Sequence, residues 1–207
     1  ITVDGGDWLG ADGTNSAKRI SRSLRFDSAD SAYLSRTPSS AGNRKTWTWS
    51  GWVKKHTNMG GLFTSGTSNN AVNYITFGYN NSDTIAFLNY ANGFQYFVET
   101  TSVYRDPNAW YHIVVAFDST QSTDTDRIKI YVNGVRQTEL GTPSWPAQDF
   151  EGNINAVDTM AIGSTYGNGT GDLYSGYLAD VHFVDGQALA PTNFGEFDDN
   201  NVWQAKE

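Results

Sequence analysis

The sequence predicts an all-β protein whose antiparallel strands form a sandwich or a barrel. Aromatic residues make up 14% of the 207 residues, whereas Asp, Glu, Lys and Arg together make up only 17%. Aromatic and β-branched residues set among Gly, Asn, Ser and Asp are typical of short strands joined by turns. The mixture of Ala, Leu, Glu and Lys that favours long helices is scarce.

Alternating hydrophobicity and turn residues delimit twelve short strands. We expect them at residues 23–27, 32–36, 46–54, 61–66, 73–79, 84–90, 95–103, 110–118, 127–133, 135–140, 158–164 and 176–186. The stretch "WYHIVVAFD" at 110–118 is apolar in both phases of its alternation, so it should be a central strand covered on both faces. Within it, His112 is expected to be a hydrogen-bonded structural residue and not a catalytic one.

The clearest turn is Asn133-Gly134, which joins two alternating runs. This pair predicts a type I′ hairpin, because both central residues of that turn need positive φ. Weaker hairpin turns of the same kind are expected at 79–83 and 91–93. Many short strands joined by hairpins at this spacing favour a β-sandwich or a barrel.

Composition excludes several classes of function. The chain has no cysteine, which rules out disulfides, zinc–thiolate sites and thiol catalysis. A net charge of −8 argues against nucleic acid and anionic membranes as partners. No apolar run approaches the roughly 20 residues of a membrane span, and the start has no signal-peptide pattern. Because it begins at Ile1, we expect a fragment of a longer polypeptide.

An ordered set of motifs resembles a known family. "WYHIVVAFD" (110–118) is followed by "RIKIYVNGVRQ" (127–137), "MAIGS" (160–164) and "GYLADVHFVDGQAL" (176–189). This set resembles the concanavalin A-like lectin/glucanase superfamily, and within it the laminin-G/pentraxin-like branch. The resemblance implies an antiparallel two-sheet jelly-roll domain over residues 23–190. Residues 1–22 would then be an irregular N-terminal lead-in, and 191–207 a C-terminal extension toward a following segment.

Two longer stretches narrow the resemblance. Residues 23–55 and residues 185–206 resemble jelly-roll segments of phage tail-fibre and other virion proteins. This implies a virion location, with neighbouring domains of a longer virion protein as partners, a possible homo-oligomer and a role in host attachment. An extracellular location is the alternative.

The same superfamily contains β-glucan hydrolases, so catalysis has to be considered. In those enzymes the two carboxyls that retaining hydrolysis requires stand on one strand as E-x-D-x-E or E-x-D-x-x-E. The chain contains neither pattern. We therefore expect no enzyme with that machinery, although a lyase with scattered Tyr, His and Arg residues stays open.

Calcium is the one cofactor that the resemblance implies. Many laminin-G/pentraxin-like domains hold Ca²⁺ through carboxylate and carbonyl oxygens. Asp180 occupies the acidic position of a late family motif, and the family topology would bring Asp27 and Asp30 near that strand. These three aspartates are candidate ligands of a structural Ca²⁺ ion. Turn-capping aspartates explain Asp27 and Asp30 equally well.

A carbohydrate site needs aromatic faces together with a few placed polar groups. Candidate residues are Trp52, Asn69, Asn70, Tyr79, Asn81, Tyr90, Tyr96, Tyr166 and Asn168, to which Tyr74, Asn80 and Phe94 add in the same strands and turns. Singly, each residue is explained better by a structural role; as a set they suggest a non-catalytic carbohydrate-recognition domain. A structural jelly roll without ligand and a polysaccharide-degrading enzyme are the alternatives.

Three tryptophans within "TWTWSGW" divide between two faces. A period of two places Trp47 and Trp49 on one face of the strand with Val53, which should pack between the sheets. Trp52 lies on the other face with two hydroxyl residues and Lys54, as a solvent-facing or concave surface would have. Trp52 is thus the one tryptophan of the three expected to stack on a sugar, unless a bulge in the strand reverses its phase.

Overall fold

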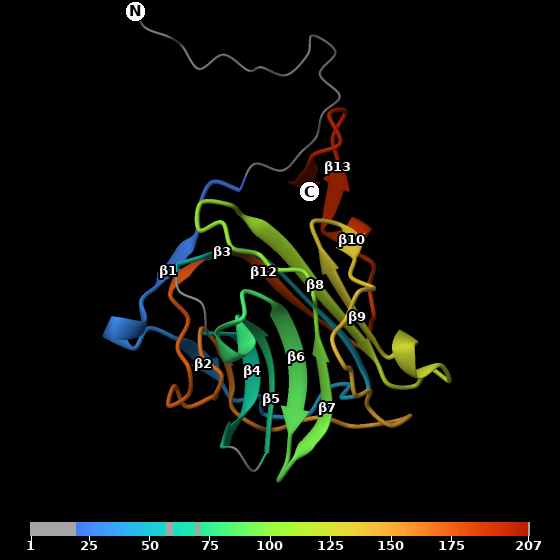
Figure 1. The fold of residues 1–207 in the computed structure, drawn as a ribbon. Coiled ribbons are helices and arrows are strands. Elements are labelled where there is room, and N and C mark those ends of the chain that lie inside the picture. Colours follow the sequence, from blue (N-terminus) through green and yellow to red (C-terminus); the bar gives the residue numbers. More distant parts are fainter. Residues whose placement is uncertain (1–19, 57–59, 69–70, 207) are drawn as a thin grey trace, which may run out of the picture.

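The structure is a computed structural model that describes residues 20–56, 60–68 and 71–206. Its strands form two layers (Figure 1). In spatial order the first sheet contains β1 (Leu24–Phe26), β12 (Gly176–Asp185), β3 (Thr46–Lys55), β8 (Tyr111–Asp118), β9 (Ile128–Val132) and β10 (Val135–Arg136). The second contains β2 (Leu34–Arg36), β11 (Met160–Ile162), β4 (Gly60–Ser68), β5 (Ala71–Phe77), β6 (Ile85–Tyr90) and β7 (Phe94–Glu99).

A separate hairpin, β13 (Gly195–Phe197) and β14 (Trp203–Ala205), follows the sandwich. In the described ranges the helical pieces are four 3₁₀ turns: η1 (Ser28–Asp30), η2 (Tyr79–Asn81), η3 (Asp124–Asp126) and η4 (Pro191–Asn193). None of the described helices is long and apolar enough to cross a membrane. Every strand pair is antiparallel. The predicted all-β two-sheet sandwich is confirmed, and the barrel alternative is wrong.

All twelve predicted strands are present, with differences at their ends. The strand expected at 95–103 stops at Glu99, and the one expected at 135–140 keeps only two residues. The second strand ends early because its chain changes partner: Leu140 bridges to Thr100, directly after β7, and Ser144 bridges to Phe97 of β7, instead of continuing along β9. The hairpin β13–β14 was not among the predicted strands.

The core forms where the two sheets face each other. Trp47, Trp49 and Val53 of β3 are at most 1% exposed, as the alternation predicts. The Trp47 ring stacks on Phe117 of β8 at 5.2 Å and meets Phe87 of β6 edge-on at 5.4 Å. Rings from both sheets therefore interlock, and aromatic pairs of this kind stabilise the core beyond simple area burial.

The Asn133-Gly134 turn has the predicted geometry. Both residues have positive φ, 47° and 79°, as a type I′ hairpin requires. A Cβ atom at Gly134 would lie 2.4 Å from the Trp203 ring of β14. Gly134 thus permits the positive φ of the turn and leaves room for Trp203 of the C-terminal hairpin to pack against it.

A bulge in β12 preserves the alternation of β3. The register shifts between Ala179 and His182, so Asp180 and Val181 both stand opposite Gly51, and Asp180 has a φ of 49°. Because the extra residue lies in β12 and not in β3, Trp52 keeps the outward phase that the sequence predicts.

The C-terminal segment covers part of the outer face of the first sheet, which corrects the expectation that the hydroxyl residues of β3 face solvent. Thr48 and Ser50 are fully buried. The Thr48 hydroxyl donates to the carbonyl of Gln187 and accepts from the amide of Leu189, both at 2.7 Å. The chain after β12 is therefore bonded directly to β3.

His112 joins the C-terminal hairpin to the sheet. Its Nδ1 atom accepts a hydrogen bond from Trp203 Nε1 at 2.9 Å, so the ring proton belongs on Nε2, which lies 2.9 Å from Ser50 Oγ. The ring is 1% exposed, and burial lowers its pKa to about 4. The prediction of a hydrogen-bonded structural histidine is confirmed.

Candidate functional site

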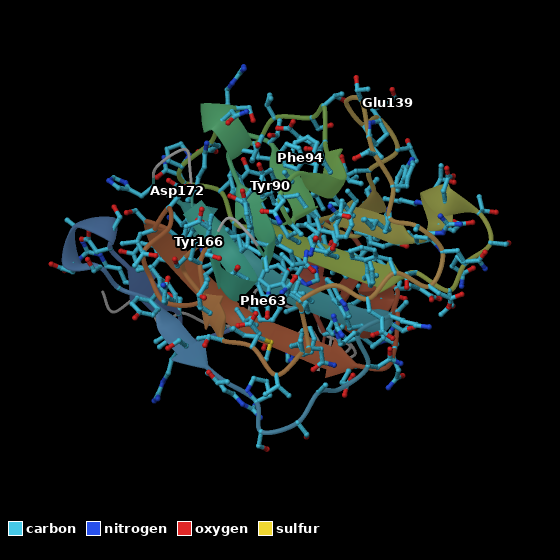
Figure 2. All side chains as sticks on the ribbon, turned by 90° about the horizontal axis from the view of Figure 1, so that it is seen from below. Phe63, Tyr90, Phe94, Glu139, Tyr166 and Asp172 are labelled. Carbon is cyan, nitrogen blue, oxygen red and sulfur yellow. The ribbon has the colours of Figure 1, made fainter. Side chains whose placement is uncertain are left out.

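A continuous row of aromatic rings lies on the outer face of the second sheet. Tyr90 lies 5.3 Å from Phe94, Phe94 lies 5.4 Å from Phe97, and Phe97 lies 4.9 Å from Tyr79, measured between ring centroids. We call these four rings the aromatic row. Figure 2 shows Tyr90 and Phe94 beside each other in the view from below.

A bulge between β6 and β7 assembles the row. Tyr90 pairs with Phe94 whereas Asn89 pairs with Tyr96, so the register skips Gln95. Phe94 consequently shares the outer face with Phe97, although three residues separate them. The bulge therefore gathers rings that a strict period of two would place on opposite faces.

The rings of the row remain accessible to a ligand. Phe94 is 50% exposed, and the other three are half-buried. Tyr90 meets Phe94 at 88°, and the next two contacts are tilted by 59°. Rings in such edge contacts do not cover each other's faces. The row therefore offers apolar ring faces at the surface of the second sheet.

Two further tyrosines and an acid lie near the Tyr79 end. Tyr74 of β5 has a raised pKa, first because of burial and then because Tyr79, Asp172 and Tyr166 are close. Burial and the nearby carboxylate of Asp172 also raise the pKa of Tyr166. Tyr166 and Asp172 come from the loop between β11 and β12 (Figure 2). A loop far away in sequence thus borders the row.

A second carboxylate lies beside Tyr79. Oε1 of Glu99 accepts hydrogen bonds from Thr84 Oγ1 at 2.5 Å and Ser82 Oγ at 3.0 Å. Burial, and then Glu99, raise the pKa of Tyr79. Within the described residues no hydrogen bond reaches Oε2 of Glu99, so this oxygen can accept one from a ligand. Ring faces beside fixed carboxylate oxygens match the C–H faces and hydroxyl groups of a sugar.

Five of the sequence-predicted residues meet here: Tyr74, Tyr79, Tyr90, Phe94 and Tyr166. Tyr96 does not, which corrects that prediction. It is fully buried in the core, where its hydroxyl accepts from Asn73 Nδ2 at 2.7 Å. The bulge at Gln95 turns Tyr96 inward while leaving Phe94 outside.

Phe97, Glu99 and Asp172 are members of this surface that the sequence prediction missed. Phe97 and Glu99 stand two residues apart in β7, so they share the outer face once that face is known. This spacing could have identified both residues from the sequence. Asp172 could not have been identified in this way, because only the folded loop brings it beside Tyr166.

The predicted asparagines contribute less to this surface than the predicted aromatic residues do. Asn69, Asn70 and the side chain of Asn81 lie outside the described residues, and Asn80 is exposed with a φ of 50°. Asn168 holds its own loop together. Its Oδ1 accepts from the amide and hydroxyl of Thr170, and its Nδ2 donates to the carbonyl of Thr67 at 3.4 Å.

Trp52 belongs to a different surface. It points outward as predicted, but from the first sheet, where its ring lies 5.0 Å from that of His112. The aromatic row is on the outer face of the second sheet. The predicted carbohydrate residues therefore divide between two faces of the sandwich.

The three candidate calcium ligands do not come together. In the β1–β12 pair Leu24 stands opposite Leu178 and Phe26 opposite Gly176. Asp27 therefore lies past the Gly176 end of this pair, whereas Asp180 lies past the Leu178 end. Across the described residues no cluster of three acidic or histidine side chains could hold a metal ion.

Asp27 has the turn-capping role that was the alternative interpretation. It accepts from the amide of Ala29 at 3.1 Å and pairs with Arg25 at 2.9 Å, while Asp30 is exposed in η1. Asp180 lies 3.3 Å from Nε2 of His182. These three residues do not come together in one site, and the binding of a structural Ca²⁺ ion by the protein stays a prediction.

The hydrolase pattern has one partial match, in the C-terminal hairpin. Glu196 and Asp198 form its first half, E-x-D, but Asn200 and Asn201 stand where the second glutamate would be. Asp198 Oδ1 accepts from the amides of Asn200 and Val202 at 2.9 and 2.8 Å. This aspartate thus closes the hairpin turn.

A family model described as the concanavalin A-like lectin/glucanases superfamily matches residues 27–193. The chain belongs to this superfamily. Membership agrees with the jelly-roll arrangement of the two sheets. The aromatic row lies inside the matched range, whereas the β13–β14 hairpin lies outside it. No curated protein matches the chain in sequence.

Solved structures share the fold at low sequence identity. A heptameric SAP-like pentraxin from Limulus polyphemus is 17% identical, with a TM-score of 0.54 over 86% of this chain and 77% of that one. Domain 4 of the extracellular arabinanase AbnA from Geobacillus stearothermophilus, in complex with arabinotriose, is 17% identical, with a TM-score of 0.53 over 72% of this chain and 65% of that one.

Tailspike protein 2 from an Escherichia coli O157:H7 bacteriophage is 14% identical, with a TM-score of 0.54 over 83% of this chain. The chain spans 23% of the length of that tailspike and 65% of the arabinanase domain. At such identities the likeness is one of fold.

Proposed function

We propose that this protein is a non-catalytic carbohydrate-recognition domain that binds glycan through the aromatic row. The observation that carries the proposal is the contiguity of Tyr79, Tyr90, Phe94 and Phe97, whose successive centroids lie 4.9–5.4 Å apart on one exposed face. Adjoining apolar side chains at a surface can mark a ligand-binding site.

The chemistry of the surface matches a polysaccharide. Each ring can pack against the C–H face of a pyranose, and Glu99 and Asp172 can accept hydrogen bonds from its hydroxyl groups. Because the four rings form a row, a chain of several sugar units would contact more than one ring. The summed contacts of an extended glycan would then exceed those of a monosaccharide.

The proposal extends to host attachment by a phage tail or related virion protein, with glycan of the host surface as the ligand. The support is the resemblance of residues 23–55 and 185–206 to virion jelly-roll segments. Neighbouring domains of a longer virion protein, and further copies of the chain, would present several such surfaces to one cell. The full parent sequence tests this part directly.

A glycan array tests the binding proposal. The folded chain is applied with Ca²⁺ and with EDTA, followed by calorimetry on any glycan that binds. Phe94→Ala should weaken binding at least tenfold. Phe197→Ala is the matched control, because Phe197 is 47% exposed, close to the 50% of Phe94, and lies on the C-terminal hairpin. Absence of binding in both conditions, or equal affinity of the two variants, would reject the proposal.

A separate assay tests the absence of catalysis. The chain is incubated with each bound polysaccharide, and new reducing ends and unsaturated sugars are measured. We expect neither product to accumulate above a heat-treated control. Product formation that Glu99→Gln abolishes would instead make the protein a polysaccharide-degrading enzyme.

A further inference from the structure

A pocket of about 370 Å³ opens on the outer face of the first sheet, away from the aromatic row. Its walls come from several distant parts of the chain. Arg22 and Ser23 precede β1, Trp52 comes from β3, Trp110 directly precedes β8, and Gln204 comes from β14. Two indoles thus stand beside a guanidinium in one concave site.

The indole N–H of Trp52 has no acceptor. Its Nε1 atom is fully enclosed and makes no hydrogen bond to the described residues. The neighbouring His112 ring cannot accept from it, because His112 uses Nδ1 for Trp203 and Nε2 for Ser50. Trp49 has the same feature in the closed core. The enclosed N–H of Trp52 is not exposed to the pocket, so the two tryptophans contribute their ring surfaces to its lining.

The lining of the pocket is rich in donors. Arg22 is exposed, and no described carboxylate lies within ion-pairing distance of it. None of the residues that line the pocket is acidic, although the chain carries a net charge of −8. Asp180 borders the adjoining hollow, which Arg22 also lines. A guanidinium without a carboxylate partner selects for an anionic acceptor.

We infer that this pocket is a second ligand site that binds an acidic sugar. The ring of the sugar would lie against Trp52 and Trp110, and its carboxylate would accept hydrogen bonds from the guanidinium of Arg22. The inference deepens the proposed carbohydrate function on which it rests, because it adds a charged monosaccharide to the ligands. The two sites lie on opposite faces, so they can be tested separately.

Paired ligands test the pocket by calorimetry at low salt. D-Glucuronate and D-glucose share a pyranose ring and differ in the carboxylate, and N-acetylneuraminate provides a second acidic sugar. The chain should bind at least one acid at least tenfold more tightly than glucose. Arg22→Gln should remove that preference, whereas Arg25→Gln should keep it, since Arg25 lies outside the pocket and pairs with Asp27.

The indole signal supplies a direct readout. In a ¹⁵N-labelled chain the Nε1–H resonance of Trp52, assigned by its loss in Trp52→Phe, should shift when the acid is added and stay in place with glucose. Phe94→Ala should leave this shift unchanged even if it abolishes polysaccharide binding. The failure of one site is thereby distinguished from failure of the other.

Three results would overturn the inference. The first is equal affinity for the acidic sugars and glucose, which includes binding of neither. The second is an unmoved Trp52 resonance in the presence of a bound acid. The third is tighter binding of a tetraglutamate peptide than of either acidic sugar, which would make the site a receptor for acidic peptides. Arg22→Gln is a surface change, so these outcomes can be read even if Trp52→Phe fails to fold.

Discussion

Acidification should destabilise the fold through His112. Burial lowers the pKa of this ring to about 4, against about 6.5 in an unfolded chain. Burial is the largest cause; the nearby Asp180 carboxylate opposes it, and His182 adds to it. The unfolded chain therefore binds more protons than the folded one between these two pH values, so stability falls as the pH decreases through that window.

The size of the effect follows from the same values. A pKa difference of about 2.5 corresponds to about 3.4 kcal/mol when the pH is below both values. Between pH 7 and pH 5 about 2 kcal/mol of this should be lost. Most carboxylates remain ionised over this range, so His112 should dominate the change.

Urea denaturation followed by tryptophan fluorescence measures the loss. The wild type should lose about 2 kcal/mol more than His112→Gln between pH 7 and pH 5, because the variant has no ring to protonate. If the variant does not fold, NMR titration of the His112 ring in the wild type gives the same answer. A ring that titrates near pH 6.5, or equal losses in both proteins, would refute the reasoning.

Two further predictions concern stability and are read by urea denaturation. Trp49→Ala should destabilise the fold by roughly 3–5 kcal/mol, because it leaves a cavity between the sheets; a loss below about 1 kcal/mol would mean that the ring is not core. Lys55→Met should cost about 3 kcal/mol or more, because Lys55 is 4% exposed and its removal leaves the Asp83 carboxylate with Arg105 as its remaining partner. Asp83→Asn in the same background should restore part of this loss, and no recovery would contradict the ion-pair explanation.

The sequence predicted the sandwich because neighbouring residues determine which face of a strand is buried and which type of turn forms. The alternation in β3 places Trp47 and Trp49 inside, and Asn133-Gly134 specifies its own turn. The role of Trp203 could not be read in this way. It depends on a hydrogen bond to His112, which lies 91 residues earlier.

Only part of the candidate site was predicted, because its remaining residues depend on strand pairing. Tyrosines on the outer strands were recognised by composition, but the bulge at Gln95 decides that Phe94 joins the row and Tyr96 enters the core. Bulges are set by the pairing of whole strands and leave little trace in a single sequence. The register of β1 on β12 separates Asp27 from Asp180 in a way that motif order alone could not reveal.

The central claim is that the exposed rings of the second sheet bind glycan. The most direct measurement is the affinity of the wild type, Phe94→Ala and Phe197→Ala for the same array-selected oligosaccharide. The claim predicts at least a tenfold loss for Phe94→Ala and wild-type affinity for Phe197→Ala. Equal affinities of all three proteins, or a loss confined to Phe197→Ala, would contradict it.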